Sequence, residues 1–246
     1  MPVGEDFSKQ PIRNRLTRAI AFGTFALVIL MVTAWQGRAE DIGASYLKMA
    51  PIEQYRMKRN GEIALARSAA PDSISREADV MVLGQNGYET AFKDKNGFVC
   101  LVERSWAGGI DDPEFWNPKL RGPICFNPPA VRSYLPVMFK KTGLALAGRS
   151  KAQIFASIKT AFDKKELPTP ELGAMCYMMS KQGYLGDHNG HWHPHLMFFT
   201  PLTDVTAWGA GLSGSPIIGI ENAPDRMTVF MIPVGKWSDG TVDAPM

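Results

Sequence analysis

The chain has 246 residues, with 27 lysines and arginines against 24 aspartates and glutamates, a formal net charge of +3. Residues 1–39 hold five of the basic and two of the acidic side chains, so 22 of each sign remain from residue 40 onward. This balanced remainder lacks the basic surface that neutralises phosphates. We therefore expect no nucleic-acid partner.

The N-terminus has the order of an export signal. Four basic side chains within residues 9–18 precede an uncharged, mostly apolar run at 19–35, and Gly37-Arg38-Ala39 supplies small residues for cleavage. This order is typical of a secretory signal peptide in residues 1–39. An uncleaved anchor is the alternative, because the run is at the short end of the about 17–25 residues that span a bilayer.

Either interpretation leaves the positive end in the cytoplasm and exports the chain from about residue 40 onward. We therefore expect residues 40–246 to form a periplasmic or secreted globular domain. In that case the protein meets a membrane only through its N-terminal segment, and only if this segment is not cleaved.

The three cysteines, Cys100, Cys125 and Cys176, all lie in the exported part. An oxidising compartment permits a disulfide, and an odd count leaves one thiol over. Cys100 lies in a strand-like run and Cys125 closes the loop after it, which favours the pair 100–125. The other two pairings remain open at this point.

The first half of the exported part predicts helix and then hairpins. Residues 44–70 favour a helix that is interrupted at Asn60-Gly61 and stopped by Pro71. Three short apolar runs come next, joined by two Asn-Gly steps, which are typical of tight hairpins. We expect an antiparallel three-stranded meander there. The runs are 79–83, 88–92 and 98–102.

The second half begins with a loop-like stretch, 104–129, and continues with helices and strands. An amphipathic pattern at 131–139 predicts a helix kinked at Pro136, and Ser150 with Gln153 predicts a capping box at the start of the next helix. The last third predicts four strands, at 174–179, 195–200, 216–220 and 227–234. The predicted fold class is α+β: a single domain with a mainly antiparallel sheet and at least three helices.

All four histidines of the chain lie within residues 188–195. Pro194 favours an extended conformation at His193, and side chains two apart on an extended segment share one face. His193 and His195 are therefore the predicted metal ligands. His191 or His188 is the predicted third ligand or proton carrier, with His191 the favoured catalytic candidate, since imidazole serves both purposes.

A further ligand is expected from Cys176, on the preceding strand, or from Asp187, at the start of the histidine segment. Imidazoles with a carboxylate or a thiolate suit zinc, and an open coordination position suits hydrolysis. Copper is less favoured, although methionines flank the segment and thioethers bind soft ions. A histidine-dependent site without metal, and an idle hydrogen-bonded segment, remain as alternatives.

Glu103 is a second catalytic candidate, because it ends an apolar strand and an acid there can face a cavity. Taken together, these residues predict an exported metal-dependent enzyme, with hydrolysis as the favoured reaction. The alternative is a non-catalytic exported binding protein or envelope-associated protein. Its partner would be a small molecule or an envelope component, bound by the histidine segment and the acidic, aromatic loop at residues 106–116.

Overall fold

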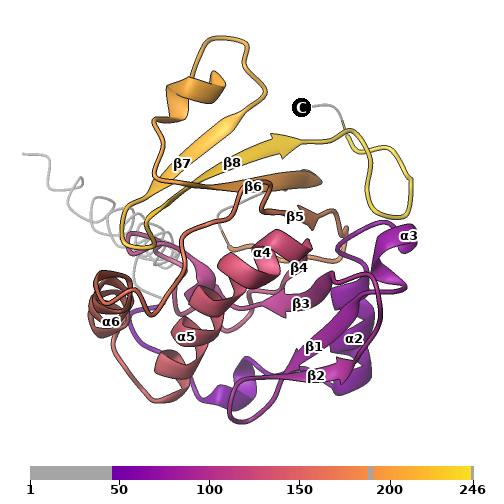
Figure 1. Cartoon of the computed structure of the whole chain (residues 1–246). Coiled ribbons are helices and arrows are strands. Elements are labelled where there is room, and N and C mark those ends of the chain that lie inside the picture. Colours follow the sequence, from indigo (N-terminus) through magenta and orange to yellow (C-terminus); the bar gives the residue numbers. More distant parts are fainter. Residues whose placement is uncertain (1–45, 188–190, 245–246) are drawn as a thin grey trace, which may run out of the picture. The chain divides into compact units, whose positions relative to one another are not determined.

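An eight-stranded mixed sheet forms the centre of the protein in a computed structural model, which describes residues 46–187 and 191–244 (Figure 1). The strand order is β2-β1-β3-β4-β5-β6-β8-β7. Every neighbouring pair is antiparallel except β1 with β3. The strands are β1 (Asp79–Leu83), β2 (Tyr88–Phe92), β3 (Val99–Glu103), β4 (Gly122–Phe126), β5 (Met175–Met178), β6 (His195–Pro201), β7 (Ile218–Asn222) and β8 (Met227–Pro233).

Five α-helices and three short 3-10 helices accompany the sheet in the described residues. They are η1 (Ile52–Gln54), α2 (Arg59–Arg67), α3 (Asp72–Ser75), η2 (Ser105–Ala107), α4 (Pro128–Ser133), α5 (Leu135–Leu146), α6 (Lys151–Asp163) and η3 (Val205–Trp208). Together with the largely antiparallel sheet, they confirm the α+β prediction. The chain from Tyr46 onward forms one compact unit.

The predicted signal segment and the candidate His188 lie outside the described residues. Within the described part, no helix has both the length and the apolar character that a membrane span requires.

The predicted three-stranded meander is wrong in its second half. β1 and β2 form the expected antiparallel hairpin, but β3 pairs with β1 in parallel, on the side away from β2. The second Asn-Gly step does not close a hairpin. Instead, Asn96 donates from its side chain to the carbonyl of Ile74 and from its backbone to the carbonyl of Glu77, so the chain turns back beneath the start of β1.

Strand β4 lies in residues 104–129, the stretch that the sequence predicts to be a loop. Its first two residues, Gly122 and Pro123, are poor strand formers, yet all five of its residues are buried between β3 and β5. Cys125 lies directly opposite Cys100 across this pair of strands and at disulfide distance, which confirms the favoured pairing. Cys176 is the remaining thiol and is buried.

Two helix predictions need correction and one is confirmed. Asn60 and Gly61 do not interrupt a helix but lie in the first turn of α2. The pattern predicted as one kinked helix is two helices, α4 and α5, that meet at Tyr134, so that Pro136 falls in the first turn of α5, where a proline is tolerated. Ser150 and Gln153 form the predicted capping box of α6.

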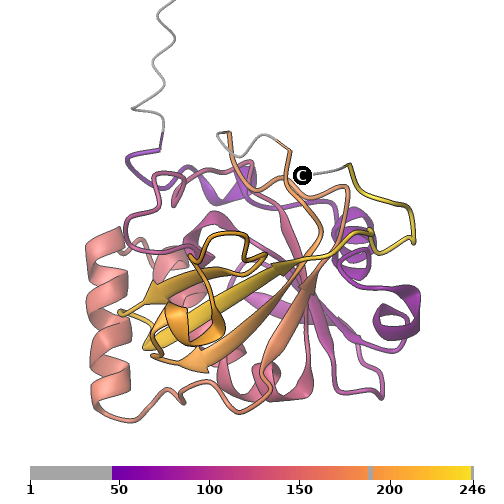
Figure 2. The same cartoon turned by 90° about the horizontal axis from the view of Figure 1, so that it is seen from above.

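The alternation of side chains along β3 assigns one core to each face of the sheet. Val99 and Leu101 pack with α4 and α5, whereas Cys100 and Val102 pack with α2. Helix α6 packs outside α5 and adds a third, aromatic cluster. Figures 1 and 2 show the helices around the sheet, and Figure 1 shows the β7–β8 hairpin extending beyond them.

A buried ion pair joins the end of β3 to helix α2. Arg104, directly after β3, donates to Glu62 of α2 at 2.7 Å, and both side chains are at most 1% exposed. Arg104 also donates to the carbonyl oxygens of Tyr55 and Val102, and Glu62 accepts from the backbone N–H of Leu83. These bonds satisfy both charges, so the pair fixes α2, β1, β3 and η1 relative to one another.

Replacing Arg104 by alanine should therefore destabilise the protein strongly, because Glu62 would keep a buried charge without a partner. We expect a loss of about 3–5 kcal/mol in the free energy of unfolding, measured by urea denaturation. Arg59→Ala is the matched control, since it removes an exposed ion pair to Glu89 from the same helix, and it should cost less than about 1 kcal/mol. Equal losses in the two variants would contradict this account.

Candidate functional site

The candidate site lies where the segment before β6 meets the C-terminal loop. Residues 191–194 are irregular, and the strand ladder begins only at His195. The C-terminal loop folds back on itself, with the Asp243 N–H donating to the carbonyl of Gly235 at 3.1 Å. The N–H of Val234 donates to the carbonyl of Pro194 at 2.8 Å. These backbone bonds bring the two segments together.

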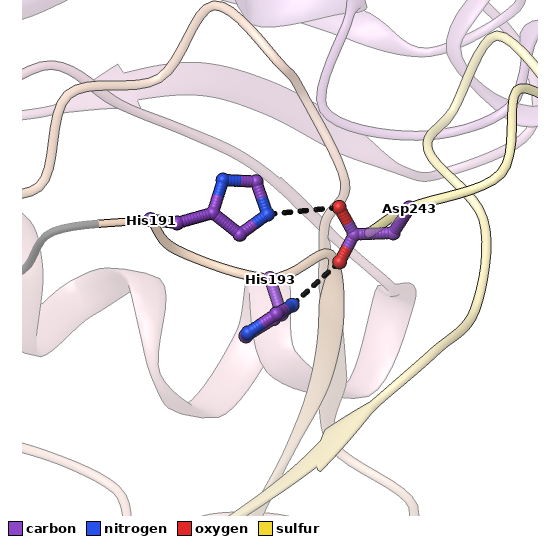
Figure 3. A group of neighbouring side chains, drawn as sticks. All are labelled: His191, His193 and Asp243. Carbon is purple, nitrogen blue, oxygen red and sulfur yellow. Dashed lines mark hydrogen bonds and ion pairs between the residues drawn. The ribbon is translucent and has the colours of Figure 1, made fainter. Parts of the chain in front are cut away.

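The carboxylate of Asp243 accepts a hydrogen bond from each of two imidazoles, those of His191 and His193 (Figure 3). His191 donates from Nε2 to one carboxylate oxygen at 3.0 Å, and His193 donates from Nδ1 to the other at 2.5 Å. One ligand atom from each of the three residues lies within 4.8 Å of the other two. Such a group of two nitrogens and one oxygen could hold a single metal ion.

The exposed fraction of the side chains increases from Asp243 to His193 to His191. The Asp243 side chain is 5% exposed, that of His193 28% and that of His191 53%. Desolvation acts to raise the pKa of Asp243, but hydrogen bonds from His193 and His191 outweigh it and hold the pKa below its usual value. The carboxylate is therefore ionised at neutral pH, which is the form that binds metals.

A pocket of about 340 Å³ adjoins this group. His193 and Asp243 form part of its wall, and the end of β8 with the loop after it forms much of the rest. The remaining lining residues are Pro233, Val234, Gly235, Val242 and Ala244. The wall is thus mostly apolar, with the polar atoms of the pair on one side. A small molecule in this pocket would lie against two of the three candidate ligands.

His195 lies outside this group. Its Nδ1 donates to the carbonyl of His193 at 2.8 Å, and its side chain is buried beside Trp192. The expected convergence of His193 and His195 assumed an extended chain across both residues, whereas the strand starts only at the second of them. His193 is therefore free to turn toward Asp243 rather than follow the alternation of β6.

Cys176 and Asp187 are also separate from the group. Cys176 lies in β5 opposite Met197, and burial raises the pKa of its thiol well above the usual value. Asp187 accepts hydrogen bonds from Tyr184 and from Tyr46, the latter at 2.6 Å. Lys119 lies 3.5 Å from the same carboxylate. Within the described residues, the carboxylate of Asp187 thus has three partners of its own.

Glu103 points to the face of the sheet that α4 and α5 cover. Gly122 lies opposite it on β4, and a side chain at this position would overlap the Glu103 carboxyl group. Although part of Glu103 stays accessible, desolvation raises its pKa to about 8, against the opposing charge of Lys141. Glu103 is therefore a protonated acid at neutral pH, apart from the histidine group.

Asp243 is the site residue that the sequence did not indicate. It lies about fifty positions after the histidines, in a short polar loop next to the C-terminus, and carboxylates in such loops are common. Only the fold of residues 234–243 brings it to the imidazoles. The clustering of the histidines indicates the two imidazoles of the group but does not indicate its carboxylate.

Comparison with known proteins adds nothing to this geometry: no protein-family model, curated protein or solved structure matches the chain.

The buried His195 should make stability depend on pH. Desolvation lowers the pKa of His195, so below about pH 6.5 the unfolded chain binds a proton that the folded protein resists. Stability should be complete above that pH and fall as the pH drops through the folded-state pKa. The free energy of unfolding, measured with chelator at about pH 7.5 and about pH 5, should fall less in His195→Gln than in the wild type. An equal fall in both proteins would contradict this assignment.

Proposed function

We propose that the protein is an exported metal-dependent enzyme in which His191, His193 and Asp243 bind one divalent transition metal ion. The observation that carries this proposal is the placement of three ligand atoms within 4.8 Å of one another beside a pocket. Zinc sites that perform catalysis use three protein ligands and leave a further position for water or substrate. The group supplies that number of ligands.

Zinc is the favoured metal because two imidazoles and one carboxylate are ligands of intermediate hardness. The same set also holds Fe(II) in oxygenases, so metal analysis has to include iron. Copper is less favoured, since the group offers nitrogen and oxygen atoms rather than the thioethers that select soft ions. Bound zinc would lower the pKa of a water ligand to about 7 and so provide a nucleophile for hydrolysis.

The pocket favours a small substrate with an uncharged, mainly apolar group. Apart from His193 and Asp243, its lining side chains are apolar or absent, and no lysine or arginine among the described residues lines it. A substrate carbonyl placed at the metal would lie at the polar side of the pocket. Small esters and amides are therefore the first substrates to test.

Export to the periplasm or the exterior is part of the proposal. The basic and apolar order of residues 1–35 favours it. The Cys100–Cys125 pair is compatible with an oxidising compartment, where such bonds persist.

A second function is favoured by a separate groove of about 980 Å³. It runs along residues 46–51, residues 112–116 and the start of α6, and so includes part of the acidic, aromatic loop. The side chain of Lys151 lies across the groove. Its ammonium donates to the carbonyl of Asp112 at 2.7 Å and lies over the ring of Phe115. A non-catalytic protein that binds a small molecule or an envelope component would use this groove rather than the histidine group.

Metal analysis separates the two functions. Protein purified without a histidine tag should bind one equivalent of zinc or iron after dialysis against chelator and reloading. His193→Ala and Asp243→Asn should each abolish stoichiometric binding, because two ligands remain. At a metal concentration 100 times the dissociation constant, the wild type should gain about 2.7 kcal/mol in the free energy of unfolding.

His195→Gln is the matched control, because it changes a neighbouring histidine outside the group. It should keep the full metal stoichiometry. If His195→Gln loses the metal while Asp243→Asn keeps it, the ligand set is not the one proposed. A wild type that binds no metal and is equally stable with and without chelator would leave the binding protein as the better account.

A further inference from the structure

A second buried ion pair lies far from the histidine group. Lys141 of α5 and Asp225, in the turn between β7 and β8, approach to 2.5 Å between Nζ and Oδ2. Both side chains are only 2% exposed. Removing two charges from water is costly, and this cost is recovered only when further hydrogen bonds satisfy the pair.

The Lys141–Asp225 pair is poorly satisfied. Oδ2 of Asp225 accepts from Lys141 and, at 2.8 Å, from the side-chain amide of Asn222. Oδ1 of Asp225 is buried and has no hydrogen-bond partner within the described residues. Among the described residues, the other contacts of the ammonium are a long one of 3.4 Å to the carbonyl of Gly108 and one of 4.8 Å to the centre of the Phe155 ring. An amine and a carboxylate are thus held together where water does not reach them.

A carboxylic acid lies on the side of the sheet that α5, the helix of Lys141, covers. Glu103 faces the same helix-covered side of the sheet, and the charge of Lys141 acts on its pKa, which desolvation nevertheless raises to about 8. Its carboxyl group makes no hydrogen bond within the described residues. A neutral carboxylic acid with free donor and acceptor atoms can accept a proton from one group and return one to another.

We propose that Lys141 and Asp225 condense to an intramolecular isopeptide bond, with Glu103, on the α5-covered side of the sheet, as the acid that moves the proton. The bond between Nζ and Cγ of Asp225 forms, and the bond between Cγ and Oδ1 breaks. Two of the three ammonium protons leave with Oδ1 as one water molecule, and the third stays on the amide nitrogen. The reaction needs no oxidant, reductant or cofactor, and Glu103 ends in its starting form.

The hydrogen bonds decide which oxygen leaves. Asn222 holds Oδ2, and its amide N–H polarises this oxygen as the future carbonyl. Oδ1, which no described residue holds, departs. The product replaces two buried charges and an unsatisfied oxygen by a neutral amide. It also ties α5 to the β7–β8 turn across 84 positions of the chain.

Mass spectrometry of the full chain tests the bond directly. After reduction and denaturation, the wild type should be lighter than its sequence by one water molecule. The mass of Lys141→Arg serves as the reference, so cleavage of the N-terminus does not affect the comparison. Trypsin should fail to cut after Lys141 and should release one branched peptide that contains both Lys141 and Asp225.

Variants separate the chemistry from the fold. Lys141→Arg keeps a buried cation but lacks the amine that forms the bond. Lys141→Arg and Asp225→Ala should therefore both have the mass of their sequences, without the loss of water. Lys140→Arg changes the exposed neighbour that pairs with Glu166, and it should still lose water. Glu103→Gln should slow the loss of water at least tenfold in protein sampled soon after synthesis, with an unchanged near-ultraviolet circular dichroism spectrum.

A folded wild type that has its full mass overturns the proposal. So does a loss of water that maps to a linear peptide around Asp225, because this would be a cyclic imide of the aspartate itself. Conversion of Glu103→Gln at the rate of the wild type would remove Glu103 from the reaction.

Discussion

The buried pair of Arg104 and Glu62 is the interaction on which the arrangement of the layers depends. It joins the end of β3 to the helix on the opposite face from α5, and its remaining donors hold the segment before α2. Because neither charge can reach water, separating the two side chains would leave an uncompensated buried charge. The disulfide between Cys100 of β3 and Cys125 of β4 lies four positions before Arg104 along the chain and fixes the next strand of the sheet.

The other half of the sheet is held differently. The β7–β8 hairpin extends beyond the helices, and its turn is connected to them through Lys141 with Asp225 and through Arg226 with Asp163. The candidate site belongs to neither anchor. It lies where the ladder of β6 has not yet begun and the C-terminal loop folds back, so its side chains are set by loop hydrogen bonds rather than by strand alternation.

Local patterns in the sequence predicted local structure well. The capping box of Ser150, the four C-terminal strands and the Cys100–Cys125 pair could be predicted from signals within a few residues or from the order of the segments. The parallel pairing of β1 with β3 was out of reach, because an Asn-Gly step indicates a turn but not the direction in which the chain leaves it. Strand β4 was hidden by Gly122 and Pro123, whose burial depends on the neighbouring strands.

For the candidate site, the sequence predicts the histidine segment but not the full set of residues that come together. The clustered imidazoles indicated residues 188–195, but the set that could share an ion depends on Asp243, a contact made across about fifty positions. Crystallography of the zinc-loaded protein with anomalous scattering at the zinc edge tests this most directly. The account predicts one anomalous peak bonded to His191, His193 and Asp243 at about 2.0–2.2 Å. A peak bonded to His195 instead, or no peak at these three residues, would contradict it.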